Sequence, residues 1–198
     1  MSEKQSWADP SPLGLFGFGM TTVLLNIHNT LLLGMSNTMA IGYGFFFGGL
    51  AQVIAGVIDA KKGNTFGATA FTSYGLFWIG LATALTLSSL GIFPLVGSLD
   101  LAWTMLVWGV FTTILFVGSF KTTKALSFIL GSLAVLFYLL AASNAIIAFD
   151  PTNTILLTIT GFEGIICGSS AIYTAAAIIL NGMYERTVLP ICPWQKKK

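Results

Sequence analysis

The sequence predicts an all-α integral membrane protein with six transmembrane helices arranged as three hairpins. Three observations support this fold class. Only 8% of the 198 residues are charged, against about 25% in globular proteins, while 55% are hydrophobic and the mean hydropathy is +0.86. Six apolar stretches reach the length of about 20 residues that a membrane span needs. The basic residues are sorted into alternate connections between those stretches.

The spans are predicted, in chain order, at about residues 12–33, 40–58, 67–90, 101–119, 125–148 and 155–181. With their short connections they fill the chain, so we expect a single transmembrane domain over residues 1–198. No G-x-x-x-x-G-K-[ST] motif occurs, which excludes transport driven by ATP within this chain. No basic region or cleavage site precedes the first span, and we expect that span to be retained.

Charge placement predicts the orientation. The first, third and fifth loops contain no base, and their only charges are Asp100 and Asp150. The termini and the second and fourth loops hold all nine Lys and Arg residues: Lys4, Lys61, Lys62, Lys121, Lys124, Arg186, Lys196, Lys197 and Lys198. Basic residues stay on the cytoplasmic side of a membrane. The pattern therefore predicts a multi-pass protein of the plasma or inner membrane with both termini cytoplasmic.

The first span carries a polar stripe. Asp9 is a good N-cap residue and Pro10 suits the first helical position, so a helix should start there. At 100° per residue, a narrow stripe of that helix then holds Phe18, Thr22, Asn26 and Asn29. Polar groups inside a membrane are costly unless they face a cavity or a protein partner. The stripe thus predicts a pore-lining helix, and the alternative is that these side chains join neighbouring helices.

Two further spans present a face at matching depth. Phe71, Tyr74, Trp78 and Leu81 share one face of the third span, and the fifth span has a face with Leu133, Phe137, Leu140 and Asn144. Each of Phe18, Tyr74 and Leu133 lies about 12 Å from its predicted helix start. The three residues are therefore expected at one level, as a hydrophobic collar below a polar outer vestibule that contains Asn29 and Asn144.

Three other polar residues lie within or near the ends of spans. Gln52, in the middle of the second span, either lines the pore or bonds a neighbouring helix. Glu163 is the only acid well inside a span, and no base shares its membrane layer. As a neutral carboxyl it can join two helices, and the sharper hypothesis makes it a proton relay facing the pore. His28 lies off the stripe and is expected to bond locally.

The motifs of enzymes and metal sites are missing from the sequence. No Ser-His-Asp set, paired carboxylates or H-E-x-x-H motif occurs. Cys167 and Cys192 provide neither a disulfide framework nor a metal-binding spacing. The sequence therefore predicts a protein that is not an enzyme, with no catalytic residues, no cofactor, no metal and no nucleic-acid partner.

Several motifs in order carry a family resemblance. Residues 9–15 read DPSPLGL, close to the pattern N-P-x-P-L-G-L, and GFGMTTVLLN follows. Further along come FFGGLAQ, KKGNTFGATAFTSYG, WGVFT and CGSSAIY, and then LN and RTVLP. From Asp9 to Pro190 the chain resembles the acetate uptake transporter family, the family of the bacterial succinate–acetate permease.

This resemblance implies a six-helix protomer similar to acid-gated urea channels, and a homohexamer with one pore in each protomer. It implies small monocarboxylates as substrates, chiefly acetate, with succinate for some members. The family's hydrophobic constriction maps by motif onto Phe18, Tyr74 and Leu133. Asp9 departs from the usual Asn and adds a charge at the cytoplasmic rim, and Glu163 falls outside the family's pattern.

The expected function is thus a membrane channel or transporter for acetate and related small carboxylates, working as an anion channel or with proton linkage. One alternative on the related fold is a channel for urea, short amides or ammonia. The other is a membrane sensor or structural protein without flux, against which the polar stripe argues.

Overall fold

The computed structural model describes residues 7–194, so Lys4 and Lys196 to Lys198 lie outside the described part. Within residues 7–194 the chain is helical and forms no strand, apart from one isolated bridge between Thr123 and Pro193. The elements are α1 (Ser11–Asn29), α2 (Thr38–Phe45), the π-helix η1 (Phe46–Ala51), α3 (Gln52–Lys61), α4 (Thr65–Ser89), α5 (Ser98–Ser119), α6 (Lys124–Phe149) and α7 (Ile155–Met183).

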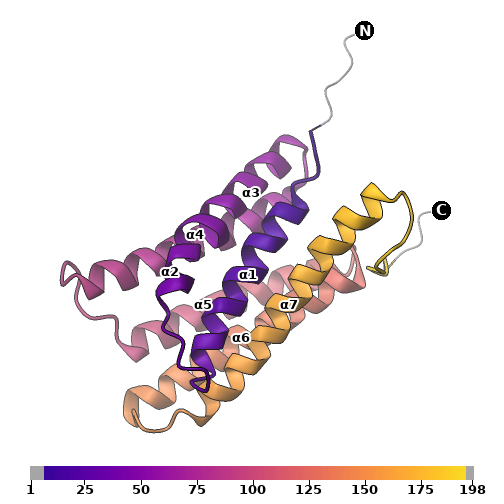
Figure 1. Ribbon diagram of the computed structural model, residues 1–198. Coiled ribbons are helices and arrows are strands. Elements are labelled where there is room, and N and C mark those ends of the chain that lie inside the picture. The colour runs from indigo at the N-terminus through magenta and orange to yellow at the C-terminus, as the bar shows by residue number, and fades with distance from the viewer. Residues whose placement is uncertain (1–6, 195–198) are drawn as a thin grey trace.

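These helices make six passes through one elongated bundle (Figure 1). The second pass consists of α2, η1 and α3 taken together, and it is one of five passes that are long and apolar enough to cross a membrane. The remaining pass, α1, has 19 residues and spans about 28 Å, close to the hydrocarbon core of a bilayer. The protein is therefore a multi-pass membrane protein.

The first pass differs from the predicted span at both ends. Its N-cap is Pro10, and Asp9 instead accepts a hydrogen bond from the Ser11 amide with Oδ1, at 2.9 Å. The helix ends at Asn29 although the apolar sequence continues to residue 33. Thr30 Oγ1 donates to the Ile27 carbonyl at 2.8 Å, and Leu31 turns the chain with φ of 59°. This local turn overrides the hydropathy pattern.

The second pass contains a π-helical segment that the sequence pattern did not predict. Two glycines in η1 allow close packing: a Cβ at Gly48 would overlap the Thr21 side chain of α1, and one at Gly49 would overlap the Gly44 carbonyl and the Ile79 side chain. A π segment shifts the helical phase and is frequent at functional sites. Here it places Gln52, the first residue of α3, against the interior of the bundle.

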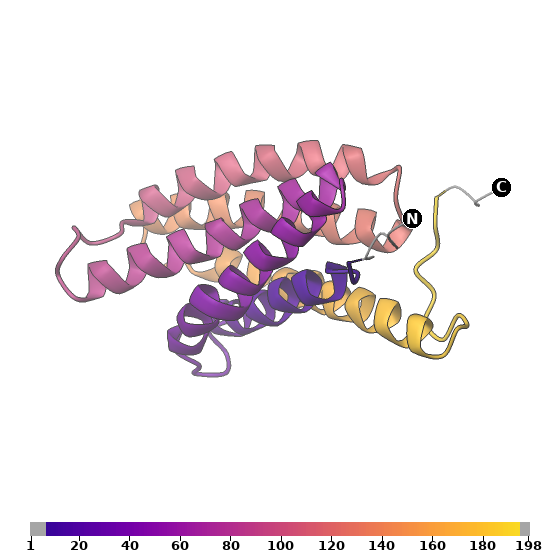
Figure 2. The ribbon, with the colours of Figure 1, turned by 90° about the horizontal axis from the view of Figure 1, so that it is seen from above.

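Glycines also allow α1 and α7 to approach closely, and the two helices run side by side in both ribbon views (Figures 1 and 2). A Cβ at Gly168 would lie 2.7 Å from the Gly19 carbonyl oxygen, and a Cβ at Gly19 would lie 2.7 Å from the Gly168 carbonyl oxygen. Small residues of this kind bring helix backbones together in lipid, where van der Waals contact drives association.

The two ends of the bundle differ in charge. The basic end holds Lys61, Lys62, Lys121, Lys124 and Arg186, and it contains the start of α1 and the end of α7 (Figure 1). The opposite end carries Asp100, in the first turn of α5, and Asp150, which follows the last residue of α6. The described part of the predicted charge sorting is thus present in the fold.

At the basic end, residues 189–194 form a strap that returns from α7 to the start of α6. The carbonyl of Cys192 accepts a hydrogen bond from the Lys124 amide at 2.8 Å, and the carbonyl of Ile191 accepts one from the Ala125 amide at 3.3 Å. Trp194 Nε1 donates to Ser127 Oγ at 2.8 Å. The strap therefore satisfies amides that a helix start leaves without internal partners. Cys192 is exposed and Cys167 is buried, and both are free thiols.

Candidate solute pathway

Two cavities lie one behind the other inside the bundle. The larger, about 250 Å³, lies at the basic end, and its wall includes Ser11, Asn64, Thr123, Thr174 and Ile191. The smaller, about 30 Å³, has room for about one or two water molecules. Its wall includes Thr22, Leu25, Asn26, Trp78, Met105, Leu136, Phe137 and Leu140.

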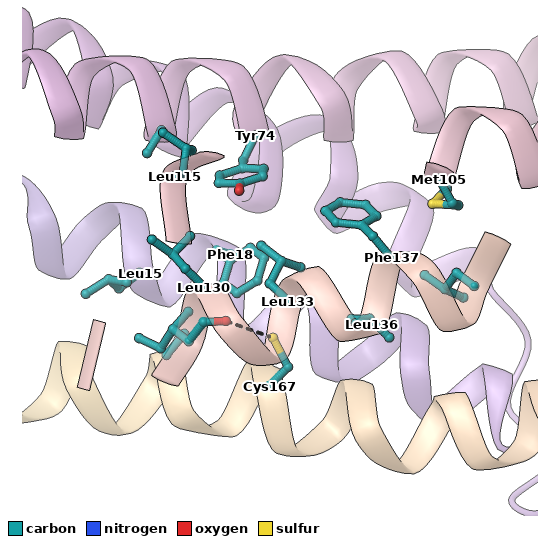
Figure 3. Close-up of a cluster of buried hydrophobic side chains, with 14 of the residues drawn as sticks. Leu15, Phe18, Tyr74, Met105, Leu115, Leu130, Leu133, Leu136, Phe137 and Cys167 are labelled. Carbon is teal, nitrogen blue, oxygen red and sulfur yellow. Dashed lines mark hydrogen bonds between the residues drawn. The ribbon is translucent and has the colours of Figure 1, made fainter. Parts of the chain in front are cut away.

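Three residues line both cavities: Phe18 of α1, Tyr74 of α4 and Leu133 of α6. Each is buried, with 6%, 4% and 3% of its surface exposed. The rings of Phe18 and Tyr74 are tilted by 43° with centroids 6.1 Å apart. Figure 3 shows the three side chains converging from different helices. We call this set the junction, because it forms the boundary between the two cavities.

The Tyr74 side chain is held on its far side by α5. Its hydroxyl donates to Thr112 Oγ1 at 2.9 Å, and Thr112 is fully buried. The ring also packs against Trp108 and Phe111, with centroids 5.9 and 5.7 Å away. Sequence reasoning missed the role of Thr112, although WGVFT, which ends at this residue, was among the quoted motifs.

Leu133 is supported by a close contact between α6 and α7. Cys167 of α7 is fully buried, and its thiol donates to the Ile129 carbonyl, one turn before Leu133, at 3.8 Å. This bond is the dashed line in Figure 3. Cys167 therefore packs behind the junction as a small apolar side chain.

The polar stripe of α1 is buried, but only part of it lines a cavity. Thr22 and Asn26 line the smaller cavity, and Thr22 Oγ1 has no hydrogen-bond partner among the described residues. Asn26 donates to the Thr22 carbonyl at 2.9 Å and accepts from Asn29 Nδ2 at 3.1 Å. Asn29 lines neither cavity, and its side chain holds that of Asn26 by this hydrogen bond. The Asn26 side chain fits because α7 has a glycine, Gly164, beside it.

Gln52 and Asn144, which were predicted to line the pathway, differ in position. Gln52 lines the larger cavity with 1% of its surface exposed. Its Nε2 donates to the Gly48 carbonyl at 2.6 Å, while Oε1 is buried with no partner in residues 7–194. Asn144 lines neither cavity, and its amide donates to the Leu140 carbonyl at 2.8 Å.

Glu163 lies between α6 and α7, away from both cavities. Its Oε1 accepts a hydrogen bond from Ser132 Oγ at 2.5 Å. This bond joins α6 to α7, as the helix-joining interpretation requires, and the role of Glu163 stays a prediction. His28 is bonded locally, through Nδ1 and the Met35 carbonyl at 2.7 Å.

One acidic residue that sequence reasoning overlooked does line the larger cavity. Asp59 of α3 has 2% of its surface exposed, and its Oδ2 has no partner among the described residues. It stands just before Lys61 and Lys62, where a polar residue looks like the solvated end of a span. No local signal in the sequence distinguishes such a residue from one turned inward.

The positive side of the larger cavity's electrostatic potential comes from backbone. No Lys or Arg lines either cavity within residues 7–194. The starts of three parallel helices, α1, α4 and α6, contribute Ser11, Phe66 and Leu126 to the wall of the larger cavity. Helix N-termini carry partial positive charge and favour anions. The cavity can therefore attract an anion without a fixed cation.

Comparisons with known proteins agree with this architecture. Residues 1–194 match the GPR1/FUN34/yaaH family. The chain belongs to this family. A solved structure described as that of the bacterial acetate channel SatP superposes with a TM-score of 0.87 at 45% identity, covering 94% of this chain and 99% of that one.

Two curated relatives of this chain are named for transport. The succinate-acetate/proton symporter SatP of Escherichia coli strain K12 is 46% identical over 184 residues, which is 93% of this chain and 95% of that protein. Acetate permease A of Emericella nidulans is 31% identical over 206 residues, covering 97% of this chain and 69% of that protein.

Proposed function

We propose that this protein is a membrane channel or transporter that carries acetate and other small carboxylates, and that it is not an enzyme. The observation that supports this most directly is the pair of cavities meeting at Phe18, Tyr74 and Leu133, in a chain whose relatives are named for acetate. The solute path runs through each protomer, from the smaller cavity across the junction to the larger one.

The junction is the constriction of this path. Its three side chains leave no polar group except the Tyr74 hydroxyl, which is already bonded to Thr112. Narrow apolar constrictions gate channels by excluding water. A solute with one methyl group and one carboxyl group suits such a site, because the methyl can pass the aromatic rings while Thr22, Asn26 and Gln52 bond the carboxyl on either side.

Transport is coupled to protons in effect, because the path holds no Lys or Arg in residues 7–194 to neutralise a carboxylate. Removing an anion from water without pairing it costs several kcal/mol, and the neutral acid avoids most of that cost. With a pKa near 4.3, roughly one molecule in 500 is neutral at pH 7. A proton gradient therefore drives uptake by raising the population of the form that crosses.

The basic end is the cytoplasmic end, since basic connections remain inside. Both termini then lie in the cytoplasm, and the larger cavity is the inner vestibule. We further propose a homohexamer in which each protomer keeps its own path. Succinate is a second substrate whose larger size must be accommodated at the junction.

Purified protein in liposomes tests this function. Labelled acetate should exchange against internal acetate faster than in protein-free liposomes, and an inward proton gradient should accelerate net uptake. Labelled urea, formamide and methylammonium provide the comparison for the alternative of a neutral-solute channel. Exchange of urea without exchange of acetate would contradict the proposal, and the absence of flux for every solute would favour a sensor or structural protein.

A further inference from the structure

Asp59 is the only acidic residue within residues 7–194 that lines either cavity of the path. It lies in the last turn of α3, on the wall of the larger cavity, with 2% of its surface exposed. The proposed function uses no acidic group in this cavity. A carboxylate here is unexpected, because a fixed negative charge repels the anion that the cavity is proposed to hold.

The carboxyl group sits in a place shaped for it at the start of α4. Its Oδ2 lies against Gly67, where a Cβ would overlap that oxygen. Gly67 is itself held by Asn64, whose Oδ1 accepts from the Gly67 amide at 3.1 Å. The Asp59 carbonyl accepts from the Asn64 amide at 2.9 Å, which closes the turn. This arrangement leaves Oδ2 without a hydrogen-bond partner among the described residues.

The charged groups near Asp59 are Asp9, at the start of α1, and Lys62, in the turn after α3. Both make other contacts: Asp9 accepts from the Ser11 amide, and Lys62 Nζ donates to the Ala8 carbonyl at 3.1 Å. The turn before α6 contributes the uncharged residues Thr122 and Thr123 to the cavity wall, and α7 contributes Thr174.

These charges limit what the cavity can hold. The three helix N-termini around it favour one negative charge. A second negative charge in the same small, largely apolar space is opposed by electrostatic repulsion, which water screens little there. The cavity therefore accommodates a charged Asp59 with a neutral acid, or a neutral Asp59 with a carboxylate. The two states differ only in which carboxyl group holds the proton.

We propose that Asp59 exchanges one proton with the carboxyl group of the solute in the larger cavity, and so couples acetate movement to proton movement. Inward transport begins when the neutral acid crosses the junction. Its O–H bond breaks as the proton passes to Oδ2 of Asp59, the resulting carboxylate leaves toward the basic end, and Asp59 then releases the proton to water there. One acetate and one proton cross together, and no other reactant is consumed.

This inference rests on the proposed function, and liposome measurements distinguish the two. Uptake of labelled acetate is measured with the membrane voltage set by potassium and valinomycin, with and without an inward proton gradient of one pH unit. Protein-free liposomes give the background of acetic acid that crosses lipid alone. In the unmodified protein we expect about tenfold stimulation by the gradient, because one pH unit changes the proton concentration tenfold, and little response to voltage.

The Asp59→Asn variant keeps the size of the side chain but cannot carry the proton. We expect gradient stimulation to fall below about twofold, and an inside-positive voltage to begin driving uptake. Without the charge of Asp59 nothing repels acetate anion from the larger cavity, so the far more abundant anion can cross without a proton. Asp9→Asn is the matched control, since it removes one negative charge from the same end without lining either cavity. It should keep the coupling of the unmodified protein.

Asp59→Glu retains a titratable group and should retain coupling at a lower rate. Folding of each variant is judged by size-exclusion chromatography. If Asp59→Asn does not fold, Asp59→Glu tests the proposal on its own. Full gradient stimulation and voltage independence in folded Asp59→Asn, or loss of coupling in folded Asp59→Glu, would overturn the inference while leaving acetate transport intact. Failure of the unmodified protein to transport acetate would instead overturn the proposed function.

Discussion

The hydroxyl of Tyr74 donates a 2.9 Å hydrogen bond to Oγ1 of Thr112, and both side chains are almost completely buried. This bond ties a junction residue of α4 to α5, two helices that otherwise make few contacts. It therefore fixes how far the Tyr74 ring extends toward Phe18 and Leu133.

Breaking this bond from its two sides should have unequal effects. Thr112→Val leaves the buried Tyr74 hydroxyl without its partner, which should destabilise the fold by about 1–3 kcal/mol. Tyr74→Phe removes that hydroxyl and leaves the smaller Thr112, with an expected cost of about 1 kcal/mol. Thermal unfolding in detergent measures both, and acetate uptake should be retained better in Tyr74→Phe. Melting temperatures equal to that of the unmodified protein in both variants would show that the bond does not hold the ring.

Widening the junction should relax selection by size. Tyr74→Ala, Leu133→Ala and Phe18→Ala each remove a side chain that lines both cavities. We expect unlabelled lactate, propionate and succinate to inhibit the uptake of labelled acetate more strongly in these variants than in the unmodified protein. Oligomer formation is checked in parallel, because truncation of a buried aromatic residue costs about 3–5 kcal/mol. Unchanged selectivity in three well-folded variants would place the constriction elsewhere.

Glu163→Gln should support uptake with the pH dependence of the unmodified protein. Glutamine keeps an oxygen that can accept from Ser132 Oγ, and Glu163 lines neither cavity. The variant cannot titrate, so it separates a helix-joining residue from a proton relay. Uptake measured between pH 5 and 8 provides the test, and a flattened pH profile in folded protein would restore the relay hypothesis.

The close contact of α1 and α7 predicts a contrast between two glycines. A Cβ at Gly168 would meet the Gly19 carbonyl at 2.7 Å and Val23 Cγ2 at 2.8 Å, whereas one at Gly80 meets nothing within 4 Å. Alanine is favoured over glycine in a helix by about 1 kcal/mol. Gly80→Ala should therefore leave the melting temperature unchanged or raise it, while Gly168→Ala should lower it. A stabilising effect of Gly168→Ala would contradict the contact.

Orientation can be tested with single cysteines in a Cys192→Ser background, which removes the exposed thiol and leaves the buried Cys167. Lys62→Cys and Thr122→Cys should not react with a membrane-impermeant maleimide added to intact cells, because the basic end is expected inside. Ser98→Cys should react. Labelling at position 62 from outside, with no labelling at position 98, would reverse the proposed topology.

The six passes and the level of the junction were predictable because both depend on position along a regular helix. Apolar length marks each span, and equal numbers of residues from the helix starts placed Phe18, Tyr74 and Leu133 together. The structure brings these three residues around the same two cavities. Their role as a constriction stays a prediction for the selectivity measurements.

Features that depend on local departures from regular helix were not predictable. The apolar run to residue 33 conceals the end of α1, because Thr30 and Leu31 turn the chain without a proline or glycine. FFGGLA gives no sign of π-helical bonding. Asn144 shares a face with Leu133 on an ideal wheel, yet it lines neither cavity, because a wheel does not include helix tilt or neighbouring helices. Asp59 was missed because a polar residue just before Lys61 and Lys62 looks like the solvated end of a span.

The strap has a consequence for the order of synthesis. Ile191 forms part of the wall of the larger cavity, yet it follows all six membrane helices in the chain. During translation the helices can therefore enter the membrane and pack before this wall exists. Until residues 189–194 emerge and bond to the start of α6, the larger cavity has an open side. A ribosome stalled just after α7, the sixth pass, would leave an inserted bundle whose larger cavity lacks the wall formed by Ile191.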